Sequence, residues 1–284
     1  MTSIVLGSKF ACKDWYPADP QLLEAIISEH YTDSSSDVRA IIAPHAGYRY
    51  CGEVFSKAMG KINRNQSYDR VFIIGPSHHF NIQNKAIVCD TYAWIGTALD
   101  NCPVDYQLAS ELAEHDVFES DAEVLYPEHS IQLHVPFVQY TLPEVPVVPI
   151  IIGTMDSDVE DKVAEIITNV ATDKSLFMIS SDFTHYGEKF NYTPYTDEID
   201  LRASIKNFDT QAIDLILRND HSAFNTFISE NRNTICGRQS ISLLLNILKG
   251  ETISIEQCDY SMSGDITKDY TNSVSYSSLT FIND

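Results

Sequence analysis

The sequence predicts an α/β protein in which a mostly parallel sheet lies between two layers of helices. Short apolar, β-branched runs alternate along the chain with longer amphipathic stretches, which is the pattern of repeated strand–helix–strand units. The short runs lack polar alternation, as expected for strands covered on both faces. A chain of 284 residues, 44% of them hydrophobic, can build one large core, so we expect a single domain spanning residues 1–284.

Five apolar runs are predicted as strands of this sheet because they are short and rich in β-branched residues. They are Arg39–Ala43, Val71–Ile74, Ala86–Cys89, Val147–Ile152 and Leu176–Ile179. Stretches with helical spacing of apolar residues are Pro20–His30, Cys51–Ile62, Val104–His115, Ser130–Tyr140 and Asp158–Ala171. Residues 195–249 are expected to form about three more helices, and two strand-like runs, Ile253–Gln257 and Ser273–Phe281, follow in the tail.

The composition argues against several classes of function. The chain has 19 basic and 40 acidic residues, so its formal charge of −21 repels phosphate backbones and predicts no nucleic-acid partner. The N-terminus lacks the pattern of a signal peptide, and the most apolar window, Val145–Gly153, is too short to span a bilayer. We therefore expect a soluble protein without membrane insertion. Its six cysteines are scattered and form no Cys-x-x-Cys pair, which argues against a disulfide framework and a zinc knuckle.

Three predicted strands end in loops that carry histidine. The loops are Pro44-His45-Ala46-Gly47-Tyr48, Gly75-Pro76-Ser77-His78-His79 and Ser180-Ser181-Asp182-Phe183-Thr184-His185. In an open α/β sheet, ligands bind in the crevice outside the carboxyl ends of the strands. Each histidine alone could simply cap its own loop by hydrogen bonding, but three such loops favour a shared site at this edge.

A cysteine offers a further ligand or a nucleophile. Cys236 precedes the apolar helix pattern that runs from Ile241 to Leu248. The N-terminus of a helix favours the thiolate, which binds metals and attacks electrophiles. The alternative is that Cys236 is a small buried apolar residue, as cysteine often is.

The segment Glu128–His134 contributes two more histidines. His129 and His134 are five positions apart, roughly 140° around a helix, so a regular helix cannot direct both at one ion. We expect His129 to face the crevice from the entry loop and His134 to pack elsewhere.

Taken together and in order, the motifs resemble those of the Memo family. The segments that carry the resemblance extend over nearly the whole chain; they are Trp15-Tyr16-Pro17, Ile41–Gly52, Gly75–His79, Glu128–Pro136, Ser180–His185, Asn233–Arg238 and Asp269–Tyr276. The resemblance implies a three-layer α/β/α sandwich like the catalytic subunit of class III extradiol dioxygenases, with a metal-capable pocket.

The resemblance also implies roles for individual residues. His45, His78 and Cys236 match the metal ligands of the family, and Asp182 and His185 match further residues of the pocket. The dioxygenases hold iron with two histidines and a carboxylate, whereas Cys236 stands here at the carboxylate position. A thiolate is a soft ligand, which favours copper(I), zinc or a differently tuned iron and argues against extradiol ring cleavage. The expected cofactor is therefore an iron or copper ion, with zinc as a third choice.

The expected pocket has aromatic walls. Trp15 and Tyr50 match residues at the mouth of the family's pocket, where phosphotyrosine-peptide binding has been proposed, and Tyr48, His79 and His129 are expected to line it as well. The partner would then be a phosphotyrosine-containing or other peptide segment of a signalling protein. The family is tied to cell motility and invasive-growth signalling, and it implies a cytoplasmic protein that also occurs in the nucleus.

Three functions remain open at this point. The first is a non-haem metal site for redox chemistry, with His185 as general acid and base and Asp182 orienting it. The second is a metal-independent adaptor that binds phosphopeptides in a vestigial dioxygenase-like pocket. The third is a hydrolase with Cys236 as nucleophile beside His185 and Asp182. Arg49 and Arg238 lie beside the key motifs and offer a guanidinium fork for carboxylate or phosphate.

Overall fold

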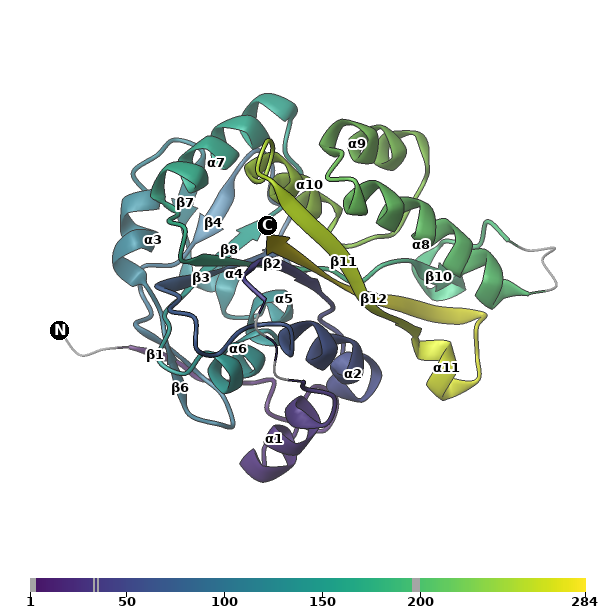
Figure 1. The fold of residues 1–284 in the computed structure, drawn as a ribbon, viewed down its shortest axis with the longest axis horizontal. Coiled ribbons are helices and arrows are strands. Elements are labelled where there is room, and N and C mark those ends of the chain that lie inside the picture. The colour runs from purple at the N-terminus through teal and green to yellow at the C-terminus, as the bar shows by residue number, and fades with distance from the viewer. Residues whose placement is uncertain (1–3, 33, 35, 196–199) are drawn as a thin grey trace.

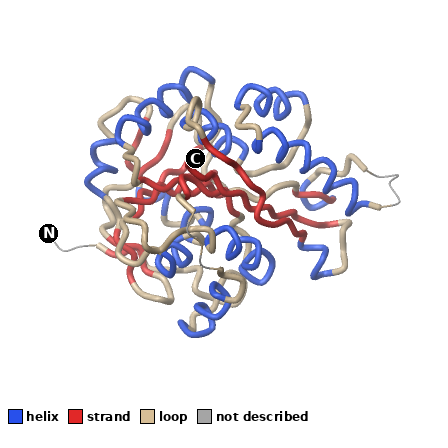
Figure 2. The backbone as a smooth tube through the Cα atoms, viewed as in Figure 1, coloured by secondary structure: helices blue, strands red, loops and turns tan. Residues whose placement is uncertain are grey.

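The computed structural model describes residues 4–32, 34, 36–195 and 200–284. Within these residues a nine-stranded sheet forms the centre of the fold, and helices cover both of its faces (Figures 1 and 2). Its path is β10-β12-β2-β9-β3-β8-β4-β7, and β11 pairs with β12. The strands of this sheet are β2 (Val38–Ala43), β3 (Arg70–Pro76), β4 (Ala86–Val88), β7 (Phe118–Ser120), β8 (Val147–Ile152), β9 (Ser175–Ser180), β10 (His185–Gly187), β11 (Ile253–Met262) and β12 (Asn272–Asn283).

The middle of the sheet is parallel, which confirms the predicted fold class. Strands β2, β9, β3 and β8 run in the same direction. Antiparallel strands extend this core on both sides, because β12 pairs antiparallel with β2 and β4 pairs antiparallel with β8. Since parallel strands share a direction, the residues that follow β2, β3 and β9 emerge at the same edge of the sheet.

The two faces of the sheet contact different helices. Successive side chains of a strand point to opposite faces, and in β2 Ile41 packs into one core while Ala40 and Ile42 pack into the other. The first core contains residues of α1, α2, α4, α5 and α6, and the second contains residues of α3, α7, α8, α9 and α10 (Figure 1). This double coverage explains why the strands lack polar alternation in the sequence.

Most of the predicted helices form, but their first and last residues differ from those predicted. The helices are α1 (Pro20–Ser28), α2 (Tyr48–Met59), α3 (Tyr106–Leu112), α4 (Ala122–Leu125), α5 (His129–Gln132), α6 (Val135–Thr141), α7 (Ser157–Val170), α8 (Leu201–Leu217), α9 (His221–Glu230), α10 (Arg238–Ile247) and α11 (Ser263–Thr267). The single helix expected over Ser130–Tyr140 is wrong, because the segment forms α5 and α6 as separate helices. Pro136 lies in the first turn of α6, where its missing N–H costs nothing, but in the interior of a longer helix it would break the hydrogen-bond ladder.

Several short elements lie outside the sequence prediction. Strands β1 (Val5–Leu6), β5 (Trp94–Gly96) and β6 (Asn101–Pro103) form a separate small sheet. Strands β11 and β12 are longer than expected, and they form a ribbon that extends to α11 (Figure 1). The three helices expected within residues 195–249 are α8, α9 and α10; residues 196–199 lie outside the described part. In the described part of the chain, no helix is long and apolar enough to cross a bilayer.

Candidate metal centre

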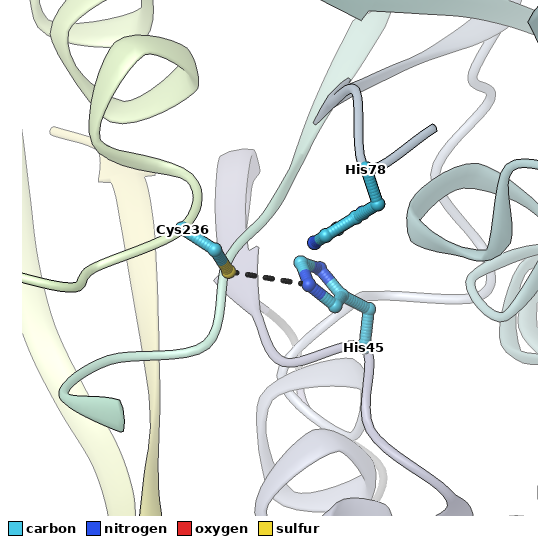
Figure 3. Close-up of side chains that lie close together, drawn as sticks. All are labelled: His45, His78 and Cys236. Atoms are coloured by element: carbon cyan, nitrogen blue, oxygen red, sulfur yellow. Dashed lines mark hydrogen bonds between the residues drawn. The ribbon is translucent and has the colours of Figure 1, made fainter. Parts of the chain in front are cut away.

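Three side chains from separate loops meet at the carboxyl edge of the parallel strands. His45 follows β2, His78 follows β3, and Cys236 precedes α10 (Figure 3). One donor atom from each residue lies within 4.8 Å of the others. His45 is buried, Cys236 is half-buried and His78 is exposed, so the cluster has a closed side and an open side.

The neighbours of His45 determine which of its ring nitrogens carries the proton. Its Nδ1 lies 2.7 Å from Ser180 Oγ, and the Ser180 hydroxyl donates to the Ser130 carbonyl at 2.5 Å. Because that donation uses the only hydroxyl hydrogen of Ser180, the serine oxygen must accept from Nδ1–H of His45. The Nε2 atom of His45 therefore has a free lone pair. Burial, followed by the neighbouring His78, lowers the pKa of His45 well below its ordinary value and keeps the ring neutral.

His78 is held by a buried carboxylate. Glu128 is 1% exposed; its Oε1 lies 2.8 Å from Nδ1 of His78, and its Oε2 accepts from the His78 backbone N–H at 2.7 Å. Burial alone would raise the pKa of Glu128, but the hydrogen bonds and charge of His78 outweigh it and lower the value to about 2. A carboxylate on one ring nitrogen, with the other nitrogen free, is the usual outer partner of a metal-binding histidine.

Cys236 reaches the site because its loop lies directly against the end of β9. A Cβ added to Gly237 would lie 2.4 Å from Ser181 Cβ, so glycine is needed for this approach. The sulfur of Cys236 lies 3.2 Å from Nε2 of His45 and accepts the Asp182 backbone N–H at 3.2 Å.

The expectation that a helix N-terminus makes Cys236 a thiolate is wrong for the metal-free chain. Burial, and then the charge of Asp182, raise the pKa of the Cys236 thiol well above its ordinary value. The thiol therefore keeps its proton, which the Asp182 carbonyl at 3.5 Å or Nε2 of His45 at 3.2 Å can accept.

Asp182 lies beside the cluster, and its carboxylate contacts His45, not His185, which we expected it to orient. Its carboxylate accepts the backbone N–H of His45 at 2.9 Å, while Nδ1 of His185 lies 3.0 Å from the carbonyl oxygens of Phe183 and Thr234. Among the described residues no hydrogen bond joins Asp182 to His185. Burial raises the pKa of Asp182, and the nearby His185 partly opposes this rise.

The arrangement expected for a hydrolase is not formed. The ring beside the Cys236 sulfur is that of His45, and within the described residues His185 makes no hydrogen bond to this thiol. The expected pairing of Cys236 with His185 and Asp182 is therefore corrected, because the imidazole that contacts the sulfur belongs to His45 and Asp182 contacts it only through its backbone.

His129 and Trp15 form a wall beside the open side of the cluster. The His129 ring centroid lies 4.3 Å from that of His78, 5.3 Å from that of His45 and 4.8 Å from that of Trp15. Burial, followed by His78, lowers the pKa of His129 to about 4. The exposed His79 lies edge-on to His129 at 6.2 Å. His134 packs away from the site, against Phe55, as expected.

Tyr48 is not part of the pocket wall. It is 3% exposed, packs against Tyr16 and Phe137, and donates its hydroxyl hydrogen to the Leu133 carbonyl at 2.6 Å. The expected wall position is thus corrected, since Tyr48 begins α2 with its ring directed into the core. Tyr50 is half-buried and packs beneath the guanidinium of Arg49, at 4.5 Å from its ring centroid.

Sequence reasoning assigned no role to the two residues that orient the histidines. Glu128 was visible only as the residue before His129, and it lies 50 positions from its partner His78. Ser180 ends β9 and lies 135 positions from His45. The only signal for Glu128 was a carboxylate next to a histidine, which is common on protein surfaces.

Comparisons with known proteins identify the family. Residues 11–280 match the family described as Memo-like protein. The chain is 32% identical over 278 residues to Protein MEMO1 of Xenopus laevis, covering 92% of each chain, and 31% identical over 294 residues to Protein MEMO1 of Homo sapiens, covering 95% of this chain and 97% of the human one. A solved structure, the uncharacterized protein JW3007 from Escherichia coli K12, covers 86% of this chain at 12% identity with a TM-score of 0.48. With the family model matching nearly the whole length and relatives above 30% identity, this chain belongs to the Memo family.

Proposed function

We propose that this protein binds an iron or copper ion, with zinc as a third choice, through His45, His78 and Cys236, and that the bound ion has a redox function. The observation that carries the proposal is the convergence of three donor atoms within 4.8 Å, two of them on imidazoles. Nδ1 of His45 and of His78 is already engaged by Ser180 and Glu128, which leaves Nε2 of each ring for the ion.

The donor set fits such an ion. Ligand bonds of about 2.0 Å to nitrogen and 2.3 Å to sulfur place the two donors roughly 3.5 Å apart around a tetrahedral ion. The observed separation of 3.2 Å between His45 Nε2 and Cys236 Sγ is close to this value. Imidazole suits iron, copper and zinc, whereas thiolate favours the softer ions, so the set selects against magnesium and calcium.

The residues around the donors have distinct tasks. The bound ion would supply electron transfer and Lewis acidity at the open side of the cluster. The Asp182 backbone N–H donates to the sulfur and tempers its charge, and a hydrogen bond of this kind tunes the potential of a metal site. Nδ1 of His185 faces two carbonyl oxygens and must carry the proton there, so its Nε2 can accept a proton from a bound molecule.

Ring cleavage of the extradiol type is not part of the proposal. The dioxygenases use a carboxylate where this chain has Cys236, and the exchange of a hard ligand for a soft one alters the charge and electronic balance at the ion. We propose a redox role in motility signalling, as the family resemblance implies, in the cytoplasm and also the nucleus.

The proposal is tested by metal titration of wild type and Cys236→Ser. Copper(I) and iron(II) are titrated anaerobically against competing chelators, on protein purified without chelators or nickel resin. Cys236→Ser should weaken copper(I) by more than the roughly 10–100-fold typical of an outer-shell change, and iron(II) by less. Cys12→Ser, at an exposed cysteine, is the control and should change neither affinity. Equal losses for both metals, or no loss, would refute Cys236 as the soft ligand.

A second candidate function is binding of peptide segments, phosphotyrosine peptides in particular. The observation that favours it is the half-buried Trp15 ring on His129, beside the exposed His79, at the open side of the cluster. Aromatic walls around a few polar groups are typical of sites that bind ligands. Such binding is compatible with a metal in the same site.

A further inference from the structure

A small cavity adjoins the candidate metal centre on the side of Cys236. It has a volume of about 170 Å³ and lies between the loop after β3, the end of β8 and the start of α10. Cys236 lines both this cavity and the metal cluster. A larger cavity, of about 620 Å³, lies at β5 and β6, and its lining contains neither histidine nor cysteine.

Arg238 gives this cavity an uncompensated positive charge. Its Nη1 donates to the Ile235 carbonyl at 3.3 Å, and the described residues accept no other hydrogen bond from its five N–H groups. No described carboxylate lies within 4.0 Å of the Arg238 side chain. The other half-buried arginines, Arg39, Arg70 and Arg202, each have a carboxylate within that distance. The lining contains no aspartate or glutamate. In a chain of net charge −21, a half-buried guanidinium without an acidic partner favours an anionic ligand.

Neutral donors line the same cavity. The Gln239 side-chain oxygen accepts the Met155 backbone N–H, and the Asn81 oxygen accepts from Gln83. The amide N–H₂ groups of Gln239 and Asn81 make no hydrogen bond to the described residues and can donate to a ligand. Thr154 adds a hydroxyl to the lining. These groups can bind the oxygens of an anion without adding charge.

A few apolar side chains lie among the polar ones in the lining. Of Pro76, Phe80, Ile82 and Ile152, Phe80 is the most exposed, at 43%, whereas Ile82 and Ile152 are buried and leave most of the accessible lining to polar groups. Phe80 therefore offers an apolar contact to the body of a ligand whose anionic group binds elsewhere in the cavity. We propose that this cavity binds a small carboxylic acid, such as an aromatic one, whose carboxylate is held by the Arg238 fork next to Cys236.

A carboxylate fits better than a phosphate for two reasons. One guanidinium balances a single negative charge, while a phosphate carries close to two and is normally bound by several cations or N–H groups. The cavity is also smaller than the roughly 300–1,000 Å³ of sites for drug-sized ligands, so it suits one compact acid. Binding of the acid in this cavity requires no metal. Only the further step, that such acids are the substrate class of the metal site, rests on the proposed function.

The test measures binding of benzoate, benzamide and inorganic phosphate to the metal-free, full-length protein by calorimetry and ligand-observed NMR. Benzamide has the shape of benzoate without its charge. The variants are Arg238→Gln, Arg238→Lys and the matched control Arg218→Gln, which removes an exposed arginine outside the cavity. Benzoate should bind wild type at least about 10-fold more tightly than benzamide, and Arg238→Gln should weaken benzoate by at least about 10-fold while leaving benzamide unchanged.

Arg238→Lys keeps the charge but loses the fork, so its affinity for benzoate should be intermediate, and Arg218→Gln should bind benzoate as wild type does. The proposal is overturned if wild type does not bind benzoate, if Arg238→Gln binds it normally, if Arg218→Gln loses as much affinity, or if phosphate binds more tightly than benzoate. Should Arg238→Gln fail to fold, Arg238→Lys and the benzoate–benzamide comparison decide. Metal titrations are run separately, so benzoate binding without metal binding would refute only the proposed function, and the reverse result only this inference.

Discussion

Replacing Glu128 by glutamine should weaken metal binding without touching a metal ligand. Glu128 accepts three hydrogen bonds: from the His78 ring, from the His78 backbone N–H, and from the Ser130 N–H at 2.9 Å. Glutamine has one acceptor oxygen, so its amide N–H₂ would face at least one of these donors. The His78 ring would then lose its charged partner and its fixed orientation.

The expected magnitude follows from these contacts. Removal of an outer carboxylate from a metal-bound histidine typically costs about 10–100-fold in metal affinity. A buried donor left without an acceptor costs about 1–3 kcal/mol of folding stability as well. The variant should thus bind copper(I) or iron(II) about 10–100-fold more weakly, and its unfolding free energy should fall by about 1–3 kcal/mol.

The assay is the chelator-competition titration, combined with urea unfolding of the metal-free protein. Glu111→Gln, at an exposed position on α3, is the matched control and should alter neither quantity. Wild-type metal affinity in Glu128→Gln, with the same loss of stability, would show that Glu128 only supports the fold and would refute its role in orienting His78.

Two further predictions concern the core and the rim of the site. His134 is fully buried, and burial lowers its pKa to about 3, although hydrogen bonding to the backbone of Pro44 and Ala43 opposes part of this shift. Between about pH 6.5 and 3 the unfolded chain binds a proton that the folded chain does not, so stability should fall with decreasing pH by up to about 1.4 kcal/mol per pH unit from this group. Urea unfolding at several pH values should show a shallower fall for His134→Leu, and parallel curves would contradict it. At the rim, Trp15→Ala should reduce the preference for phosphotyrosine-containing over unphosphorylated peptide by about 2–10-fold, as expected for one aromatic contact. Peptide titrations of wild type and the variant measure this preference. If wild type has no such preference, or if the variant keeps it, Trp15 is not the peptide contact.

The parallel core and the meeting of the histidine loops could be predicted from the sequence because their signals are local. The apolar runs that became β2, β3 and β9 are contiguous, and proline or glycine follows two of them directly. Once these strands are parallel, the positions of His45 and His78 at one edge follow from strand direction alone.

The protonation and the orientation of individual side chains at the site depend on the tertiary structure. Cys236 and His45 are 191 positions apart, and nothing near Cys236 in the sequence indicates that burial beside Asp182 keeps its thiol protonated. Tyr48 has the same local sequence signal whether it lines a pocket or packs in the core, and its neighbours Tyr16 and Phe137 decided for the core. A side chain's residue type and position on a strand or loop are local properties, whereas its protonation, rotamer and partner depend on packing between segments far apart in the chain.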